Sequence, residues 1–135
     1  KPLIADNPLV EFIGEISDRE KPDFLSGAIG LLVPIDWPEP FGLVMIEAMA
    51  CGTPVIAYNR GSVPEIIEDG LTGFIVEDEI SAISSVGRLS MLNRDAIRKQ
   101  FETRFTARRM ALDYLAAYRS LMEAKPRFKL VASAE

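Results

Sequence analysis

The sequence predicts an α/β fold in which an open parallel sheet of about four strands is flanked by helices and followed by a helical C-terminal segment. Three observations favour this fold. Four short apolar or β-branched runs alternate with segments of helical pattern. Two of these runs, 29–34 and 54–58, are almost continuously hydrophobic, as strands buried on both faces of a parallel sheet are. Such alternation is typical of parallel sheets with right-handed crossovers.

The elements can be placed in chain order from these patterns and from capping residues. The expected strands are 10–13, 29–34, 54–58 and 73–76, and the expected helices are 18–28, 41–51, 64–68, 80–92, 95–105 and the segment from 106 onward. Ser17 or Asp18 would cap the first helix, and Thr106 would cap the last. Gly52, followed by Pro54, would end helix 41–51.

The last helix carries an apolar stripe of Met110, Tyr114, Tyr118 and Met122, one residue every four. We expect this stripe to be a packing face. The basic residues around it would form a solvated face, or would meet an acidic partner domain. We expect residues 1–125 to form one partial domain and residues 126–135 to form a flexible tail.

Composition excludes several classes of function. The chain has 135 residues, 48% of them hydrophobic, which suits one globular domain. Its net charge of −5 argues against a general nucleic-acid binder or a polybasic membrane binder. The absence of histidine and the presence of one cysteine exclude His-based catalysis, an internal disulfide and Cys-x-x-Cys sites within this sequence. We therefore expect no metal and no cofactor.

The sequence also bears on location. It has no run of about 18 apolar residues and no signal-peptide pattern at its start. The predicted location is cytoplasmic, and peripheral contact of the full-length protein with the inner membrane face stays open. The chain lacks an initial Met and a strand is predicted within the first dozen residues, so we expect it to be part of a larger protein.

The most informative segment is 37–54, which begins just after a predicted buried strand. Ligands in parallel α/β folds bind at the carboxyl ends of strands. Gly42 allows close backbone approach, and the helix behind it presents free amides and the positive end of its dipole. These features predict an anion site suited to a phosphate or diphosphate.

Two carboxylates flank this helix start. Glu47 is the only ionisable residue of an otherwise apolar helix, and it lies one turn beyond Leu43. A buried carboxylate needs a partner, which the hydroxyl pair of a sugar or ribose would supply. An ion pair, for instance with Arg60, or exposure of this helix face is the structural alternative. Glu39 lies between two prolines and is either a ligand or a solvated turn residue.

The segment resembles the donor-binding signature of the retaining glycosyltransferases of the GT-B class, family 4 (group 1). Glu39 and Glu47 have the family's spacing of Glu, seven residues and Glu, and every residue of the frame Glu-Pro-Phe-Gly-Leu-x-x-x-Glu-Ala-Met-Ala-x-Gly-x-Pro-Val is present. The resemblance covers roughly residues 9–120. The flanking stretches that are also similar to the family are 10–14, 61–67 and 69–74.

The resemblance implies a Rossmann-like domain that binds a nucleotide-diphosphate sugar. It implies that Glu47 binds the ribose hydroxyls and that Glu39 is the catalytic residue, in contact with the transferred sugar near its reacting carbon. The remaining donor-binding residues that it implies are Phe41, Gly42 and Leu43 through their backbone amides, Val44 on the ribose side and Gly14 beside the base.

The reaction implied is transfer of a hexosyl group to an acceptor hydroxyl, with retention and without a metal, as in carbohydrate biosynthesis. The family's Arg and Lys on the diphosphate have no match here, and neither has its N-terminal acceptor-binding domain. We therefore expect this chain to be most of the C-terminal donor-binding half, with the N-terminal domain of the same protein as its partner. By itself it should bind nucleotide-sugar weakly and be inactive.

Other readings stay open. A non-catalytic nucleotide-sugar-binding module and a sugar-nucleotide epimerase share this architecture. A glycan phosphorylase would need a lysine-bound pyridoxal cofactor, and no lysine, Lys21 included, has the sequence context of a pocket. Cys51 is expected to pack as a small apolar residue, since no histidine could activate it. The sequence does not identify the sugar, the base, the acceptor or the oligomeric state.

Overall fold

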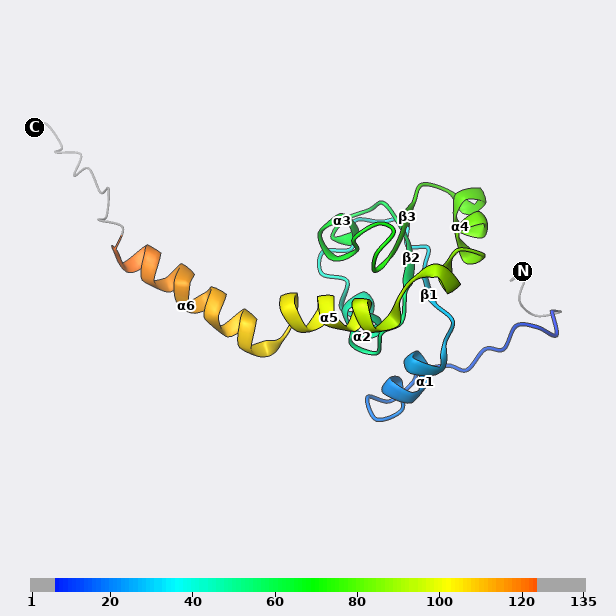
Figure 1. Cartoon of the computed structure of the whole chain (residues 1–135), viewed down its shortest axis with the longest axis horizontal. Coiled ribbons are helices and arrows are strands. Elements are labelled where there is room, and N and C mark those ends of the chain that lie inside the picture. Colours follow the sequence, from blue (N-terminus) through cyan, green and yellow to red (C-terminus); the bar gives the residue numbers. More distant parts are fainter. Residues whose placement is uncertain (1–6, 124–135) are drawn as a thin grey trace, which may run out of the picture.

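The computed structural model describes residues 7–123, which form a small α/β body and a long C-terminal helix (Figure 1). The strands are β1 (Leu31–Val33), β2 (Val55–Tyr58) and β3 (Gly73–Val76). The helices are α1 (Lys21–Gly27), α2 (Leu43–Ala50), α3 (Val63–Ile66), α4 (Glu79–Val86), the short 3₁₀ helix η1 (Leu89–Met91), α5 (Arg94–Arg104) and α6 (Ala107–Glu123).

The three strands form one parallel sheet in the order β1-β2-β3, with Leu31 opposite Val55 and Val55 opposite Gly73. The parallel α/β fold is therefore confirmed, but within residues 7–123 the sheet has three strands rather than about four. Residues 10–13 form no strand. Phe12 in this run is 88% exposed, because a β-branched run becomes a strand only where a neighbouring strand accepts it.

The sheet is buried unevenly. In β2, Val55 and Ile56 are almost completely buried, as the hydrophobic run 54–58 predicts. The run 29–34 was expected to be buried to the same degree, but Ile29 and Leu32 are exposed. Leu32 is in register with Ile56 and Phe74. The cluster that covers those two residues includes no residue of β1, which leaves this face of β1 open.

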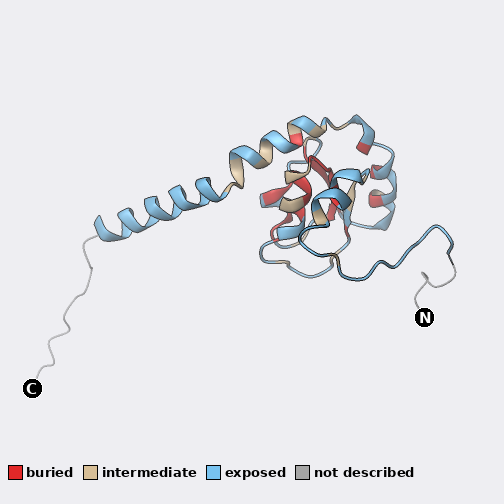
Figure 2. Ribbon diagram, turned by 90° about the horizontal axis from the view of Figure 1, so that it is seen from below, coloured by how far each residue is buried: buried red, intermediate tan, exposed pale blue. Residues whose placement is uncertain are grey.

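Helices cover both faces of the sheet. On one face, α2 buries Met45, Ala48 and Met49 in a cluster that also contains Ile97 of α5. On the other face, residues of α4 and η1 pack with Ile56, Phe74 and Val76. The core residues gather in this body in Figure 2, while the helix that follows it lies outside. Along the chain, the carboxyl end of β1 leads directly into the loop before α2.

Two helix starts differ in how well the sequence predicted them. α1 begins at Lys21 with Glu20 as its N-cap residue and no side-chain cap, so the predicted caps Ser17 and Asp18 are wrong. The Ser17 hydroxyl instead donates to the Glu20 carboxylate at 2.5 Å. At the start of α6, the amide of Arg109 donates to the Thr106 hydroxyl at 3.3 Å, as expected of a capping residue.

α6 extends away from the body, and all of its residues are exposed (Figures 1 and 2). The stripe of Met110, Tyr114, Tyr118 and Met122 therefore contacts no core within residues 7–123, contrary to the expected packing face. The predicted tail, 126–135, lies outside the described residues. No helix in the described part of the chain combines the length and apolarity needed to cross a membrane.

Candidate functional site

The start of α2 is built around a glycine in the left-handed region. Gly42 is the N-cap residue, with φ of 70° and ψ of 40°, and it is buried. A Cβ at this position would meet the side chains of Met45, Ile66 and Ser62, so both the backbone conformation and the space require glycine. The helix begins at Leu43, two residues later than predicted. Its first amides have no partner within the helix, as at any helix N-terminus.

Glu39 is held against this helix start by backbone and side-chain contacts. Its carbonyl oxygen accepts a hydrogen bond from the amide of Ser62 at 2.9 Å. Its carboxylate oxygen Oε1 accepts one from the amide of Gly42 at 3.3 Å. Gly61, with φ of 53°, lies so close to the Glu39 backbone that a Cβ would collide with it. The loop thus presents a carboxylate at the positive end of the α2 dipole.

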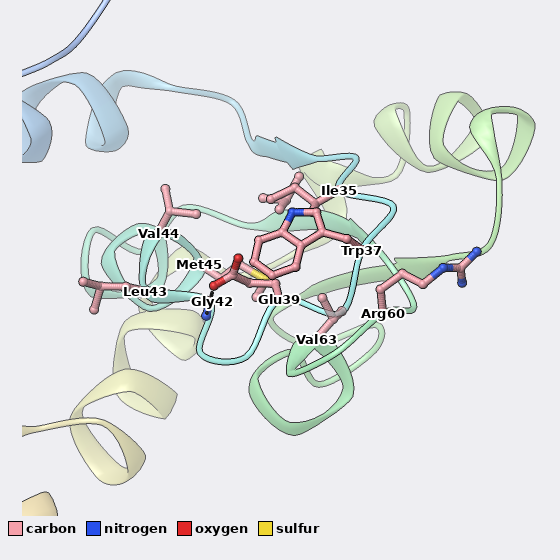
Figure 3. Close-up of a pocket in the computed structure, with 10 residues that line it drawn as sticks. Ile35, Trp37, Glu39, Gly42, Leu43, Val44, Met45, Arg60 and Val63 are labelled. Carbon is pink, nitrogen blue, oxygen red and sulfur yellow. Dashed lines mark hydrogen bonds between the residues drawn. The ribbon is translucent and has the colours of Figure 1, made fainter.

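A cavity of about 250 Å³ opens beside this carboxylate (Figure 3). Its walls come from the end of β1, the loop before α2, the first turn of α2 and the start of α3. The lining residues are Val33, Ile35, Trp37, Glu39, Gly42, Leu43, Val44, Met45, Arg60 and Val63. Most of this wall is apolar, so Glu39 and the backbone at Gly42 are its main polar groups besides Arg60.

Arg60 is directed to the outer side of this cavity rather than to either predicted carboxylate. Its guanidinium lies 3.1 Å from the Asp36 carboxylate and 3.5 Å from that of Glu77. Figure 3 shows it pointing away from Glu39. The suggested ion pair between Arg60 and Glu47 is therefore wrong.

Glu47 is instead paired with Lys21 of α1. The Lys21 ammonium lies 2.9 Å from Oε1 of Glu47 and 3.0 Å from the Asp18 carboxylate. The hydrogen bonds to Glu47 and then to Asp18 raise the pKa of Lys21 above its ordinary value, which keeps the ammonium charged. The Glu47 side chain is 30% exposed, so it is neither fully buried nor part of an open solvated face.

A second cavity, of about 420 Å³, lies between α1 and α2. Its lining residues are Asp18, Lys21, Pro22, Leu25, Leu43, Glu47, Ala50 and Cys51. Lys21 thus lies in a pocket, against the expectation for the lysines of this chain. Leu43 borders both cavities, so both reach the first turn of α2.

The structure brings some of the predicted site residues together and separates others. Glu39, Gly42, Leu43 and Val44 border the first cavity, and Glu47 borders the second. Phe41 is 62% exposed and lines neither of these two cavities with its side chain. Its predicted role belongs to its backbone amide and stays a prediction, because the position of the side chain does not test it.

Gly14 lies in the segment before α1, with φ of 70°, and borders neither cavity. A Cβ there would meet no atom within 4 Å, so its conformation, rather than crowding, favours glycine. A position beside the base stays a prediction for this residue.

Sequence reasoning missed two features of the site. Trp37 lines the first cavity, although its position just after a buried strand was available as a signal. Lys21 was missed because its partner is 26 residues away and no local pattern identifies it.

Ser62 adds a further polar group, since its buried hydroxyl has no hydrogen-bond partner among the described residues and lies near Gly42.

The described residues also bear on metal binding and on the role of the cysteine. Within 7–123, no three His, Cys, Asp or Glu side chains come together as a metal site would require. Cys51 is partly buried and packs against the core cluster, as expected of a small apolar residue.

Several known proteins are similar to this chain. Residues 6–108 match the family model described as glycosyl transferases group 1. The chain is 30% identical to the phosphatidyl-myo-inositol mannosyltransferase of Mycobacterium leprae over 68% of its length, which is 25% of that protein. It is 42% identical to the D-inositol 3-phosphate glycosyltransferase of Streptomyces scabiei over 55% of its length, which is 16% of that protein.

A solved structure supports the fold. The sucrose-phosphate synthase of Thermosynechococcus elongatus superposes with a TM-score of 0.69 at 32% identity, over 86% of this chain and 31% of that one. This likeness supports the Rossmann-like, GT-B fold that the sequence predicts. The chain thus spans a third or less of the length of each of these three proteins.

Proposed function

Because the chain belongs to the group 1 glycosyl transferases, we propose that it binds the nucleotide-diphosphate sugar donor of an enzyme that transfers the sugar to an acceptor hydroxyl with retention. One observation carries this proposal. Two cavities lie beside α2, both bordered by Leu43 at its first residue, and each is lined by one carboxylate of the Glu39–Glu47 pair. In a nucleotide-diphosphate sugar the diphosphate links two hydroxyl-bearing groups, so a sugar and a ribose could each reach one carboxylate while the diphosphate lies at the helix start.

The donor would lie across α2. Its diphosphate would be held at the helix N-terminus, where the dipole favours an anion, by the amides of Phe41, Gly42 and Leu43. The Gly42 amide, which donates to Glu39 in this structure, would then donate to the diphosphate. The sugar would occupy the first cavity, with Glu39 near the reacting carbon. The ribose would enter the second cavity and bring its hydroxyls to Glu47.

Val44 and Gly14 are the remaining donor-binding residues that the sequence predicts. Gly14 would lie beside the base. Val44, expected on the ribose side, borders the first cavity and not the second, so in this placement it would line the transferred sugar. Neither residue supplies charge, so each would act through shape and backbone approach. We expect these residues to affect which donor binds more than the rate at which the bond between sugar and diphosphate breaks.

The proposed reaction passes through an oxocarbenium-like transition state from which the diphosphate leaves with negative charge. Amides aimed at that charge stabilise it as it develops. The proposal needs no metal, since the α2 backbone can supply this stabilisation. Glu39 and Glu47 would not work as the acid and base of a glycoside hydrolase, because Glu47 is assigned to the ribose.

The acceptor would be bound elsewhere in the full-length enzyme. The chain covers only 16–31% of the three proteins compared above. We propose an N-terminal domain of the same protein as the acceptor-binding partner and a cytoplasmic location, with contact at the inner membrane face where the acceptor is a lipid. The chain alone should give no sugar transfer.

The test is a binding titration of the chain with UDP, GDP and ADP, repeated on Glu47→Gln. Hydrogen bonds to charged groups contribute about 1.5–3 kcal/mol, so the variant should bind the preferred nucleotide about tenfold or more weakly. Glu79→Gln makes the same charge change on α4, on the other face of the sheet, and should leave affinity unchanged. Absence of saturable binding at millimolar nucleotide, or equal affinity in wild type and Glu47→Gln, would contradict the proposal.

A further inference from the structure

The ion pair between Lys21 and Glu47 joins two helices at the wall of the second cavity. Lys21 is the first residue of α1, and Glu47 lies in the middle of α2. Their side chains are 34% and 30% exposed, so the pair is half-buried rather than free in solvent. Because both residues line the cavity, a ligand in it would meet the pair directly.

The pair uses only one oxygen of the carboxylate. Lys21 donates to Oε1 of Glu47, while no protein group among the described residues hydrogen-bonds to Oε2. Lys21 also contacts Asp18, but the Asp18 side chain is 94% exposed and lies on the solvent side. The ammonium therefore bridges two carboxylates, of which Glu47 is the more buried.

These contacts have two consequences for a ligand. A glutamate held at one oxygen loses less conformational freedom when its other oxygen accepts a hydrogen bond, so binding is favoured by preorganisation. The ammonium also offsets the negative charge of Glu47, which would otherwise repel a diphosphate at the nearby helix start. Neither consequence requires Lys21 to touch the ligand.

We propose that Lys21 is a positioning residue that holds Oε1 of Glu47 and leaves Oε2 as the acceptor for the ribose diol, so that it sets the preference of this site for ribonucleotides over 2′-deoxyribonucleotides. This inference rests on the proposed function. Removing Lys21 would free the carboxylate, and the energetic difference between a ribose and a deoxyribose would then shrink.

The experiment compares affinities within each variant. The wild-type chain is titrated with whichever of UDP, GDP and ADP it binds and with the 2′-deoxy form of that nucleotide. We expect the wild type to prefer the ribonucleotide about tenfold, since a hydroxyl bonded to a carboxylate is lost in the deoxy form. Lys21→Met should reduce this preference to about twofold, and Lys21→Arg, which keeps the charge and a donor, should retain most of it.

The design separates positioning from general stabilisation. The ratio of two affinities in one variant does not depend on the fraction of folded protein. Lys99→Met removes an exposed lysine on α5 and should leave the ratio unchanged. In a Glu47→Gln background the preference should already be lost, so adding Lys21→Met should change it no further.

The outcomes distinguish the two proposals. If the wild type binds no nucleotide, the proposed function fails and this inference fails with it. If the wild type prefers the ribonucleotide and Lys21→Met weakens both ligands by the same factor, Lys21 acts on the phosphates or on folding. That result would overturn the positioning role and leave the proposed function standing.

Discussion

The position of Glu39 depends on a close approach by a glycine of another loop. Gly61 passes the Glu39 backbone so closely that its missing side chain is a structural requirement. The hydrogen bond from the Ser62 amide to the Glu39 carbonyl, 2.9 Å long, fixes the same approach. The loop before α2 is therefore held from the β2–α3 turn, and not only by its own sequence.

Gly61→Ala tests this close approach. The substitution adds the strain of a left-handed alanine, about 1–2 kcal/mol, and forces a Cβ against the backbone of Pro38 and Glu39. We expect the free energy of unfolding to fall by about 2–4 kcal/mol in total. Denaturant unfolding measures it.

Gly70→Ala is the matched control for that variant. Gly70 has φ of 77°, but a Cβ there would meet no atom within 4 Å. Its loss should be limited to the conformational strain of about 1–2 kcal/mol. Equal losses in the two variants would show that the approach of Gly61 to Glu39 does not constrain the loop.

At this scale the sequence predicted the groups but not their partners. The carboxylate spacing and Gly42 pointed to the helix start because they lie within one short segment. Lys21 could not be assigned to Glu47 from the sequence, since helical periodicity does not say which residue of one helix faces the next. The same reason made Arg60 a plausible but wrong partner.

At the scale of elements, a hydrogen-bonded cluster ties α5 to the chain around β1. The buried Thr53 hydroxyl donates to the carbonyl of Leu25 at 2.6 Å and accepts from Arg94 at 2.8 Å. Arg94 also donates to the carbonyls of Ser26 and Ala28, both at 2.8 Å. α5 is thereby held against the end of α1, and both helices contact α2.

Thr53→Val should therefore destabilise the protein. It preserves shape but leaves the Leu25 carbonyl without its donor in a buried place, which costs about 1–3 kcal/mol. Thr103→Val is the control, because the exposed Thr103 hydroxyl bonds only to carbonyls of its own helix, and its effect should stay within about 0.5 kcal/mol. Thermal and denaturant unfolding would measure the stability of each variant. Equal stability of the two variants would contradict the stabilising role of the Thr53 hydrogen bonds.

The start of α4 predicts a pH effect. The Asp78 carboxylate accepts from the Ser81 amide at 2.8 Å, and this bond, with that of the Ser81 hydroxyl, lowers the pKa of Asp78 below its ordinary value. Its charged form therefore stabilises the fold at neutral pH, and that contribution is lost as pH falls through the lowered pKa.

Asp78→Asn keeps an acceptor at the cap but removes the titration. We expect the wild type to be more stable than the variant at neutral pH and to lose that advantage progressively as the pH falls through the lowered pKa of Asp78. Unfolding midpoints at several pH values measure the difference. A difference that stays constant with pH would mean that the charge of Asp78 contributes nothing.

Elements with local signals were predicted more successfully than elements that depend on neighbours. α2, β2 and β3 follow from hydrophobic runs with clear stop residues such as Gly52. The run 10–13 has the same composition as a strand but forms none, because pairing is a property of the sheet and not of the run. The exposure of Leu32 in β1 likewise depends on neighbours, since the helices on that face pack over β2 and β3.

At the scale of the whole molecule, the described chain divides into a packed body and an exposed helix. The core is made by α2, α5 and the sheet, where Ile97 is fully buried. α6 is amphipathic, yet its apolar side chains remain exposed within residues 7–123. Periodicity predicted an apolar face correctly, but it could not say whether this part of the chain covers that face.

Two aliphatic truncations test this division. Ile97→Ala should lower the free energy of unfolding by about 2–5 kcal/mol, as large-to-small changes in a core do. Leu121→Ala, at a residue that is 71% exposed on α6, should change it by less than about 0.5 kcal/mol. A loss of several kcal/mol in Leu121→Ala would show that α6 is packed in solution.

The central claim is that the N-terminus of α2 holds the diphosphate of a nucleotide donor while Glu47 holds its ribose. The most direct measurement is the change in backbone amide NMR shifts when nucleoside diphosphate is added, compared with the same nucleoside without phosphate. With the diphosphate we expect the largest shift changes at Gly42, Leu43 and Glu47. With the nucleoside we expect a change at Glu47 and little change at Gly42. Changes centred on α4 or α6, or none on α2 at millimolar ligand, would contradict it.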